Sequence, residues 1–314
     1  MVPATTGSDD AAATQVEAPA IEVGGLTKRY GTIAAVDGLS FSVSRGTVAG
    51  FLGPNGAGKT TTMRVLLGLA APTSGESRVL GVPYAHLSDP LRRVGAVLEI
   101  TGFHPGRTGR NHLRVMAREG GISEERIDST LAQVGMTEAA GRRVGQYSLG
   151  MKQRLGLASA MLGDPEILIL DEPANGLDPA GVAWLRAFLR AFADAGRTVF
   201  VSSHVLGEIS QIADRLVVID KGKLVAEGPV AQITGTSGGT VVVRSPGAER
   251  LRTALEMAGA SVETDAEGAL HVSGMLADRV GEIAAAERLV LHELRTQQAT
   301  LEEAFLKLTS GGGL

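Results

Sequence analysis

The chain contains no cysteine among its 314 residues. Disulfide bonds, thiolate zinc sites and a cysteine nucleophile are therefore excluded, and the composition fits a reducing compartment such as the cytoplasm. Aromatic residues make up only 4%, and packing in or near the core is the simplest interpretation of the one tryptophan, Trp184. No apolar run approaches the ~20 residues of a membrane-spanning helix. The formal net charge of -4 argues against a broad surface for nucleic acid.

The two ends of the chain differ in composition from its middle. Residues 1–20 are small and polar, and they lack the basic stretch and apolar segment of a secretion signal. We interpret them as a disordered tail. Residues 235–239 have the composition of a linker. The expected organisation is thus a main domain over residues 21–234 and a small accessory domain over residues 235–314.

Short apolar runs recur in the main domain, at residues 48–52, 167–170 and 199–201. Runs of this length without polar alternation favour strands that are buried on both faces, as in a parallel sheet covered by helices. The expected fold class is therefore α/β with a parallel-sheet core.

Two further elements are predicted downstream of these runs. Apolar residues at three-to-four spacing predict a helix over residues 181–195, which Gly196 ends. Residues 221–222, Lys-Gly, predict a hairpin turn between strands at 216–220 and 223–227.

The accessory domain has the predicted element order β-α-β-β-α-β, followed by a closing helix. This is the split-βαβ, or ferredoxin-like, pattern of an α+β domain. The expected strands cover residues 240–244, 261–264, 269–272 and 290–293, and the expected helices cover 248–258, 276–285 and 301–308. It contains only two histidines, His271 and His292, and the sequence offers no nucleophile–base–acid constellation, so we expect an accessory or regulatory module without chemistry of its own.

Residues 53–60 have the sequence Gly-Pro-Asn-Gly-Ala-Gly-Lys-Thr, directly after a predicted strand. This is the P-loop pattern, in which glycines let successive backbone N–H groups curl around phosphate oxygens at a helix N-terminus. Lys59 is predicted to reach the β- and γ-phosphates, and the Thr60 hydroxyl to bind Mg²⁺. The residues predicted to bind nucleotide here are Gly53, Pro54, Asn55, Gly56, Ala57, Gly58, Lys59, Thr60 and Thr61.

Asp171 and Glu172 directly follow the apolar run at residues 167–170. In a P-loop protein a carboxylate at the end of such a strand holds Mg²⁺, usually through water, and Asp171 is predicted to do so. Glu172 stands next to it, where a carboxylate can orient and polarise an attacking water molecule as a general base. The P-loop upstream favours these roles over an exposed acidic loop.

Residues 147–154 have the sequence Tyr-Ser-Leu-Gly-Met-Lys-Gln-Arg. With the P-loop, this stretch resembles the signature of ATP-binding-cassette (ABC) ATPases, usually Leu-Ser-Gly-Gly-Gln, any residue, Gln and Arg. Four residues match that form and three depart from it: Ser148, Gly150, Gln153 and Arg154 match, and Tyr147, Leu149 and Met151 depart. In the family this helix N-terminus grips the γ-phosphate bound to the opposite subunit. The resemblance implies that Ser148 and Gly150 contact nucleotide and that a homodimer completes the active site.

Three further segments match the family in the same order along the chain. Tyr30 resembles the aromatic residue that stacks on adenine. Residues 175–179, Asn-Gly-Leu-Asp-Pro, resemble the loop that links the two composite sites across the dimer. His204 follows a predicted buried strand and resembles the histidine that contacts the γ-phosphate and the attacking water, which implies a catalytic role.

Glu99 stands where most family members carry a glutamine that binds Mg²⁺ and signals to the transmembrane partner. Glutamate keeps an oxygen for Mg²⁺, loses the amide donor and adds negative charge beside the triphosphate. We therefore count Glu99 among the predicted metal-binding and catalytic residues. Together with residues downstream it resembles exporter ATPases of the bacitracin and lantibiotic resistance type, and so does the closing segment at 301–306. The downstream matches are Phe103, Pro105, Thr108 and Leu113.

The resemblance implies an ABC nucleotide-binding domain with a P-loop core, an N-terminal β-subdomain and a helical subdomain over roughly residues 83–145. It implies an ATPase that uses ATP and Mg²⁺ and drives a drug, antibiotic or peptide exporter. Its expected partner is a separate transmembrane permease, which would hold the chain at the cytoplasmic face of the cell membrane. No nucleic acid is expected as a partner. Three alternatives stay open: a soluble ABC ATPase that remodels a ribosome or DNA, an importer motor, and a P-loop kinase.

Overall fold

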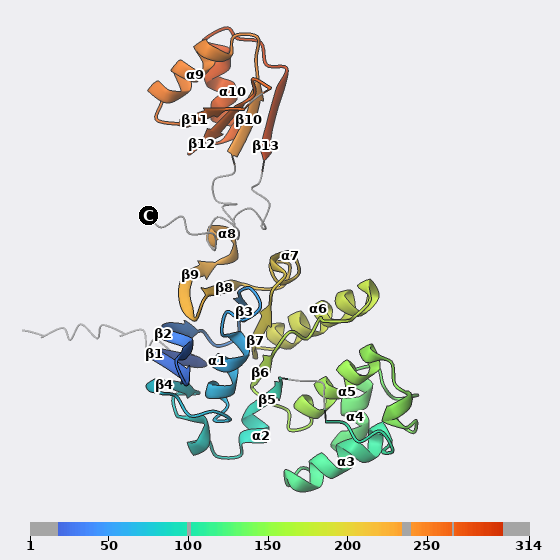
Figure 1. Cartoon of the computed structure of the whole chain (residues 1–314). Helices are drawn as coiled ribbons and strands as arrows, with labels where there is room; N and C mark the ends of the chain where they lie inside the picture. Colours follow the sequence, from blue (N-terminus) through green and yellow to red (C-terminus); the bar gives the residue numbers. More distant parts are fainter. Residues whose placement is uncertain (1–17, 99–101, 234–239, 266, 298–314) are drawn as a thin grey trace, which may run out of the picture.

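The computed structural model describes residues 18–98, 102–233, 240–265 and 267–297, and the largest sheet among them has six strands (Figure 1). Their order across the sheet is β5 (Val94–Val97), β6 (Ile167–Leu170), β7 (Thr198–Ser203), β3 (Val48–Leu52), β8 (Arg215–Asp220) and β9 (Lys223–Pro229). The first five strands run parallel, and β9 is antiparallel to β8. Every residue of β3, β6 and β7 is buried, as the unbroken apolar runs predict. The predicted α/β class is confirmed.

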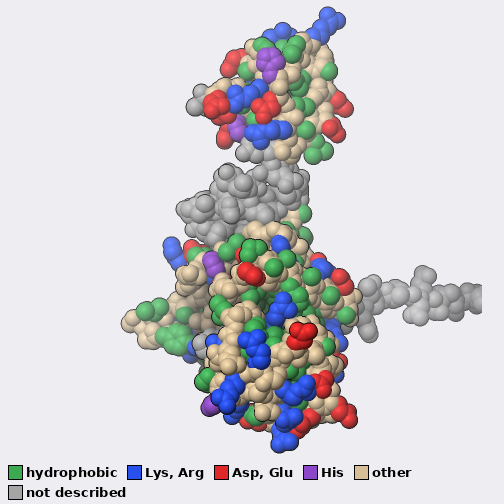
Figure 2. All heavy atoms as spheres, turned by 90° about the vertical axis from the view of Figure 1, so that its right-hand side faces the viewer, with side chains coloured by type: hydrophobic (Ala, Val, Ile, Leu, Met, Phe, Trp, Pro, Cys, Tyr) green, Lys and Arg blue, Asp and Glu red, His purple; other side chains and the backbone are tan. Residues whose placement is uncertain are grey.

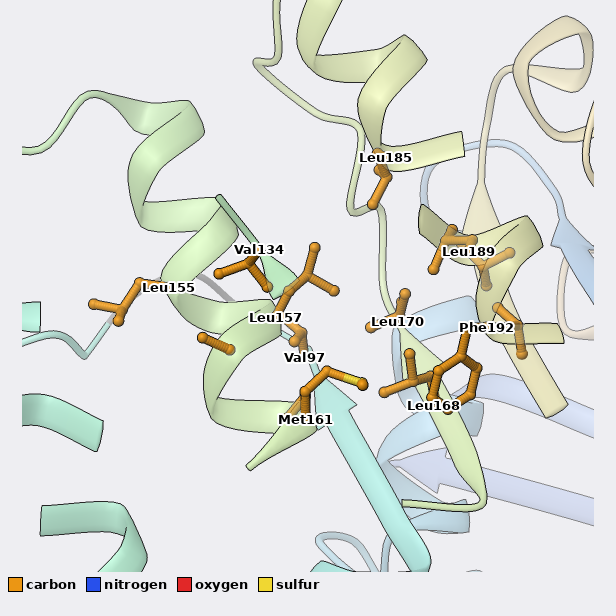
Figure 3. Close-up of a cluster of buried hydrophobic side chains, with 14 of the residues drawn as sticks. Val97, Val134, Leu155, Leu157, Met161, Leu168, Leu170, Leu185, Leu189 and Phe192 are labelled. Atoms are coloured by element: carbon orange, nitrogen blue, oxygen red, sulfur yellow. The ribbon is translucent and has the colours of Figure 1, made fainter. Parts of the chain in front are cut away.

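Helices pack against both faces of this sheet. They are α1 (Lys59–Leu66), α2 (Pro90–Arg93), α5 (Leu149–Met161), α6 (Pro179–Asp194), α7 (Leu206–Ile209) and α8 (Val230–Ile233). Helix α6 begins two residues before the predicted start, because Asp178 caps it by accepting from Gly181 N at 2.7 Å and Pro179 occupies its first turn. In Figure 3, Leu189 and Phe192 of α6 lie against Leu168 of β6 in one buried cluster.

A second, antiparallel sheet forms the predicted β-subdomain. Its strands are β1 (Ile21–Tyr30), β2 (Ile33–Val43) and β4 (Ser74–Val79), in the order β2-β1-β4. Phe41 of this sheet stacks on Phe51 and Phe200 of the main sheet, with ring centroids 5.5 and 5.7 Å apart. The two sheets therefore share one core, which positions the end of β1 relative to the loop after β3.

The helical subdomain is built from α3 (Gly109–Glu119) and α4 (Arg126–Gln133), packed on α5. Leu113, Leu131 and Leu155, one from each helix, are fully buried. Its predicted start at residue 83 is too early, since β5 belongs to the main sheet. The short 3-10 turns Tyr84–His86 and Val144–Gln146 lie at the two ends of the predicted range.

The predicted hairpin after β8 is confirmed. Lys221 and Gly222 both have positive φ, 47° and 81°, as a two-residue turn between antiparallel strands requires. Gly222 also accepts a hydrogen bond from Asp37 N at 2.9 Å, and an added Cβ would lie 2.9 Å from Val36 Cα. The close approach fixes glycine at this position.

The C-terminal part of the chain forms a separate antiparallel sheet with two helices. Its elements are β10 (Thr240–Arg244), α9 (Ala248–Met257), β11 (Ser261–Thr264), β12 (Leu270–Ser273), α10 (Ala277–Ala286) and β13 (Glu293–Gln297). The strand order β11-β12-β10-β13, with neighbouring strands antiparallel, is that of the predicted split-βαβ pattern. The predicted closing helix lies outside the described residues.

The last strand of this part was predicted three residues too early. After α10 the chain turns through Arg288, at φ 55°, and Leu289 N donates to Ala284 O at 2.9 Å. Leu289 packs against the local core while Val290 is 65% exposed, and the ladder with β10 begins only at Glu293. The apolar residues at 289–291 therefore lie in the connection between α10 and β13.

The boundary at residues 234/235 adjoins a stretch outside the described ranges, so the division into two domains stays a prediction. We expect deletion of residues 239–314 to leave the rest of the chain folded and able to bind ATP. The described C-terminal residues have their own buried cluster, and the clusters of the main sheet contain no described residue beyond 233. Thermal melting and calorimetric titration with ATP measure this. An insoluble truncated chain, or one that fails to bind ATP, would contradict the division.

None of the helices in the described ranges combines the length and the apolar character needed to cross a membrane.

Candidate nucleotide-hydrolysis site

The loop between β3 and α1 requires glycine at two places, for its backbone conformation at one and for a close approach at both. Gly58, the N-cap of α1, has φ 106°, and an added Cβ would lie 2.4 Å from Ala35 O. At Gly53 an added Cβ would lie 2.5 Å from Ile219 O. Because Gly58 has no side chain to cap the helix, the first N–H groups of α1 are available to an anion.

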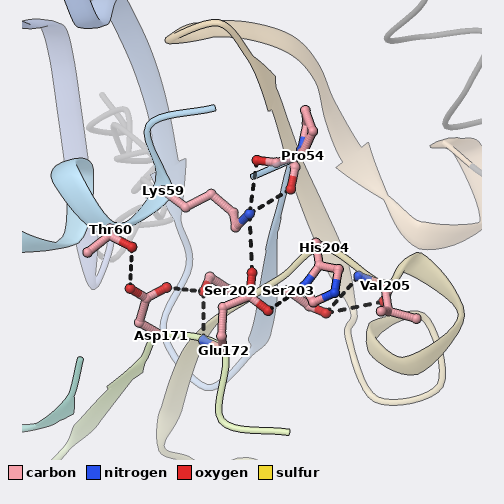
Figure 4. A network of polar contacts seen from close by, with 10 residues as sticks. Pro54, Lys59, Thr60, Asp171, Glu172, Ser202, Ser203, His204 and Val205 are labelled. Carbon is pink, nitrogen blue, oxygen red and sulfur yellow. Dashed lines mark hydrogen bonds and ion pairs between the residues drawn. The ribbon is translucent and has the colours of Figure 1, made fainter. Parts of the chain in front are cut away.

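Lys59 begins α1 and is only 5% exposed. Its Nζ donates to Gly53 O at 2.6 Å and to Pro54 O at 3.2 Å, so the ammonium lies inside the loop (Figure 4). Asn55 and Gly56, by contrast, are exposed at the tip. The loop thus offers a fixed cation and backbone donors to one ligand, as phosphate binding requires.

Thr60 and Asp171, predicted from distant parts of the sequence, meet at the end of β6. Thr60 Oγ1 donates to Asp171 Oδ2 at 2.5 Å, and the carboxylate is 9% exposed. Two oxygen ligands of the kind that Mg²⁺ prefers therefore lie together. The described residues contain no group of three or more His, Cys, Asp or Glu able to hold a metal, so nucleotide oxygens and water would have to supply the other ligands.

Glu172 lies between Lys59 and His204. Its Oε2 is 2.8 Å from His204 Nδ1, and its Oε1 is 3.2 Å from Lys59 Nζ (Figure 4). The Lys59 contact is an ion pair without aligned hydrogen-bond geometry, since Oε1 is shielded from solvent and has no hydrogen-bond partner. Glu172 also adopts φ 48°, an unfavourable backbone conformation for a residue with a side chain. One carboxylate is thus held between two cationic or proton-donating groups.

Two polar residues at this site were not assigned a role from the sequence. Ser202, fully buried in β7, contacts both Asp171 and Glu172. Gln153 of α5 is 1% exposed, and its Nε2 donates to Pro173 O. The sequence shows a polar residue within a predicted buried strand or helix, which could have marked both residues as candidates. The group to which each side chain hydrogen-bonds depends on the fold and could not be predicted.

The signature stretch forms the N-terminus of α5. Ser148 caps the helix by accepting from Met151 N at 3.2 Å, and Leu149 beside it is 50% exposed. Tyr147, a departure from the usual signature, is buried and donates to Ala139 O at 2.7 Å, and burial raises the pKa of its phenol. No described hydrogen bond joins Ser148 or Gly150 to the P-loop of the same chain.

A hollow lies beside this helix start, lined partly by the loop at residues 175–179 and by Trp184. Trp184 is half-buried and packs against the core, as expected: it stacks on Phe188 with ring centroids 5.5 Å apart, and the Arg154 guanidinium lies 3.8 Å from its ring centroid. Arg154 also donates to Val134 O at 2.9 Å, which connects α5 to the helical subdomain. Figure 2 shows several Lys and Arg side chains on this side of the molecule.

The remaining predicted site residues are less constrained. Tyr30 ends β1 and is 51% exposed, with Lys28 Nζ 4.9 Å from its ring centroid. Thr61 is half-buried in α1. Glu99 lies outside the described residues. The structure thus brings Lys59, Thr60, Asp171, Glu172 and His204 together, while Tyr30, Ser148 and Gly150 stand apart from that cluster in the contacts described.

A P-loop at the end of a parallel strand, with two carboxylates at the end of the next strand but one, defines a P-loop nucleoside triphosphatase. The family model for ABC transporters matches residues 36–175, and a domain of unknown function (DUF8746) matches residues 239–302. The chain belongs to the ATP-binding subunits of ABC transporters, and it is an ATPase. The kinase alternative is thereby excluded.

Two curated relatives and one solved structure show the extent of the similarity. The bacitracin transport ATP-binding protein BcrA of Enterococcus faecalis is 37% identical over 309 residues, covering 94% of this chain and 97% of its own. The daunorubicin/doxorubicin resistance ATP-binding protein DrrA of Streptomyces peucetius is 37% identical over 306 residues, covering 92% of each. The structure of an ABC transporter ATP-binding subunit, 27% identical, has a TM-score of 0.62 over 69% of this chain and 92% of its own.

Proposed function

We propose that two copies of this chain bind two ATP molecules with Mg²⁺ and drive the export of a drug, antibiotic or peptide through a separate permease. The functions named for the two relatives, bacitracin transport and daunorubicin/doxorubicin resistance, support export over import. The observation that carries the ATPase mechanism is the Glu172 carboxylate, held against Lys59 and His204 beside the Thr60–Asp171 pair.

Within that site each side chain has a distinct role. Lys59 neutralises charge on the β- and γ-phosphates, and the uncapped start of α1 adds backbone donors. Glu172 orients a water molecule toward the γ-phosphorus and takes up its proton, while His204 holds the carboxylate in place. Thr60 and Asp171 would hold Mg²⁺, which when bound neutralises charge on the phosphate oxygens. Catalysis then rests mainly on positioning and electrostatics.

The signature helix supports assembly as a homodimer. Its start is exposed at Ser148 and Leu149, and its first turn contains no acidic residue. A helix N-terminus with a serine hydroxyl is an anion site. We propose that Ser148 and Gly150 of one copy contact the nucleotide held by the P-loop of the other, and that Tyr30 stacks on its adenine.

Membership of a transporter family supports a permease partner and a location at the membrane. The chain would lie on the cytoplasmic face of the membrane, bound through the permease, and the C-terminal domain would act as an accessory module. Affinity purification of the tagged chain from solubilised membranes tests this. Recovery of a stoichiometric polytopic membrane protein is expected, whereas recovery of ribosomes or DNA instead would support a remodelling ATPase.

Glu99 is proposed to be a coupling residue near Mg²⁺. We expect Glu99→Gln to hydrolyse ATP at least as fast as the natural chain, because it keeps one carbonyl oxygen and removes a negative charge near the phosphates. Such a charge could contribute roughly 1–4 kcal/mol in a partly solvated site. Glu99→Ala is expected to retain basal hydrolysis but lose stimulation by the permease. Hydrolysis rates against Mg²⁺ concentration, with and without permease in lipid, measure both; coincidence of all three curves in both settings would refute a coupling role.

A further inference from the structure

Ser202 is a hydroxyl group in the middle of the buried sheet, with no exposed surface. Its Oγ donates to Asp171 Oδ1 at 2.5 Å, and it accepts from the backbone N–H of Glu172 at 2.9 Å (Figure 4). The proton and one lone pair of the hydroxyl are therefore each used by a different acidic residue of the site.

The first of these hydrogen bonds sets the direction of the Asp171 carboxylate. With Oδ1 bound to Ser202, the other oxygen, Oδ2, faces Thr60 Oγ1 at 2.5 Å. A carboxylate held at one oxygen in a buried site cannot rotate freely. Ser202 thereby presents Oδ2 at the place where the Thr60 hydroxyl lies.

The second hydrogen bond holds the backbone at Glu172. This residue has φ 48°, a conformation that persists only where neighbouring groups stabilise it. The Ser202 hydroxyl accepts from the backbone N–H of Glu172, and Gln153 Nε2 donates to the carbonyl of the next residue, Pro173. Two buried side chains, from β7 and α5, thus fix the chain on either side of Glu172.

We propose that Ser202 is a positioning residue for both carboxylates, orienting Asp171 toward Mg²⁺ and holding Glu172 against Lys59 and His204. The inference rests on the proposed function of Asp171 and Glu172. The adjacent Ser203 serves a different purpose: its hydroxyl accepts from Val205 N at 2.9 Å and donates to Val205 O at 3.3 Å. Ser202 therefore orients the carboxylates, while Ser203 stabilises the loop after β7.

Three substitutions of Ser202 distinguish the effect of its hydroxyl group from the effect of its side-chain shape. Ser202→Ala removes the hydroxyl, while Ser202→Thr and Ser202→Val have nearly the same shape and differ in whether a hydroxyl is present. The β-branched residues suit a strand, and Ser202 lines a small cavity together with Val201 and Ile209. Ser159→Ala is the control, since the described hydrogen bond of the Ser159 hydroxyl goes to Leu155 O of its own helix, at 3.0 Å.

The measurements are kcat, and calorimetric ATP affinity with Mg²⁺ and with EDTA. For Ser202→Ala and Ser202→Val we expect kcat to fall roughly 10- to 100-fold, the effect of losing a hydrogen bond to a charged group. The gain in ATP affinity on adding Mg²⁺ should shrink, while affinity in EDTA, which also reports folding, should stay within about twofold. Ser202→Thr and Ser159→Ala should behave like the natural chain.

Two results would overturn the inference: unchanged kcat and Mg²⁺ dependence in Ser202→Ala, or equal loss in the Thr and Val variants, which would make shape rather than the hydroxyl responsible. Failure of the proposed function is recognised separately, by full activity of Glu172→Gln. An inactive Glu172→Gln together with fully active Ala and Val variants would refute the role of Ser202 alone.

Discussion

Replacing Glu172 by glutamine is expected to stop steady-state ATP hydrolysis while ATP binding is retained. Glutamine has nearly the same size and can still contact His204, but it cannot take up the proton of an attacking water molecule. Loss of a general base should lower turnover by on the order of 10²-fold or more. The phosphate-binding groups, Lys59 and the start of α1, are unchanged by the substitution, so ATP affinity should persist.

Phosphate release under saturating ATP measures the turnover of Glu172→Gln, and calorimetry measures its ATP affinity. Glu227→Gln is a matched control, because Glu227 is an exposed acid on β9, remote from the contacts of the site. Turnover of Glu172→Gln within a factor of two of the natural chain would rule out the assigned base. Loss of ATP binding would show that the glutamate is needed for the structure of the site.

Replacing Lys59 by alanine is expected to weaken ATP binding itself. The Nζ is the cation that the P-loop carbonyls of Gly53 and Pro54 hold in place, and it also neutralises Glu172 Oε1 at 3.2 Å. ATP affinity should fall roughly 10- to 100-fold, the scale of a lost charge-assisted contact. Lys59→Arg should not restore it, because a planar guanidinium does not fit a site built for a compact ammonium.

Calorimetric titration with ATP compares Lys59→Ala, Lys59→Arg and a control, Lys223→Ala. Lys223 is an exposed lysine whose partner, Asp37, is 3.3 Å away, so its removal costs little. Thermal melting verifies that the Lys59 variants are folded. Unchanged ATP affinity in Lys59→Ala would contradict the assigned role of the lysine.

The main sheet could be predicted from the sequence because its strands are covered on both faces. β3 and β6 contain only apolar residues and glycine, and β7 has the apolar stretch 199–201, which is the pattern of strands buried on both faces. β13 was displaced in the prediction for the opposite reason. It is a polar edge strand, Glu293–Gln297, whereas the apolar Leu289 and Leu291 before it pack against the local core outside the strand.

The reactive residues of the site could be predicted because the motif positions have chemical requirements of their own. A P-loop needs glycines, a lysine and a hydroxyl in a fixed order, and Asp171 and Glu172 end a buried strand. Ser202 and Gln153 could not be assigned in this way, since each is defined by a contact with a residue twenty or more positions away. Trp184 packs against the core, as expected, but the Arg154 guanidinium over its ring at a surface hollow could not be predicted.

Two copies of this chain are proposed to close around two ATP molecules, with Ser148 of each copy completing the site of the other. Size-exclusion chromatography with light scattering tests this directly, as the molar mass of Glu172→Gln with and without ATP and Mg²⁺. We predict the mass of one chain, 32.4 kDa, without nucleotide and twice that mass when ATP is bound but not hydrolysed. A single-chain mass at saturating ATP would contradict the composite site.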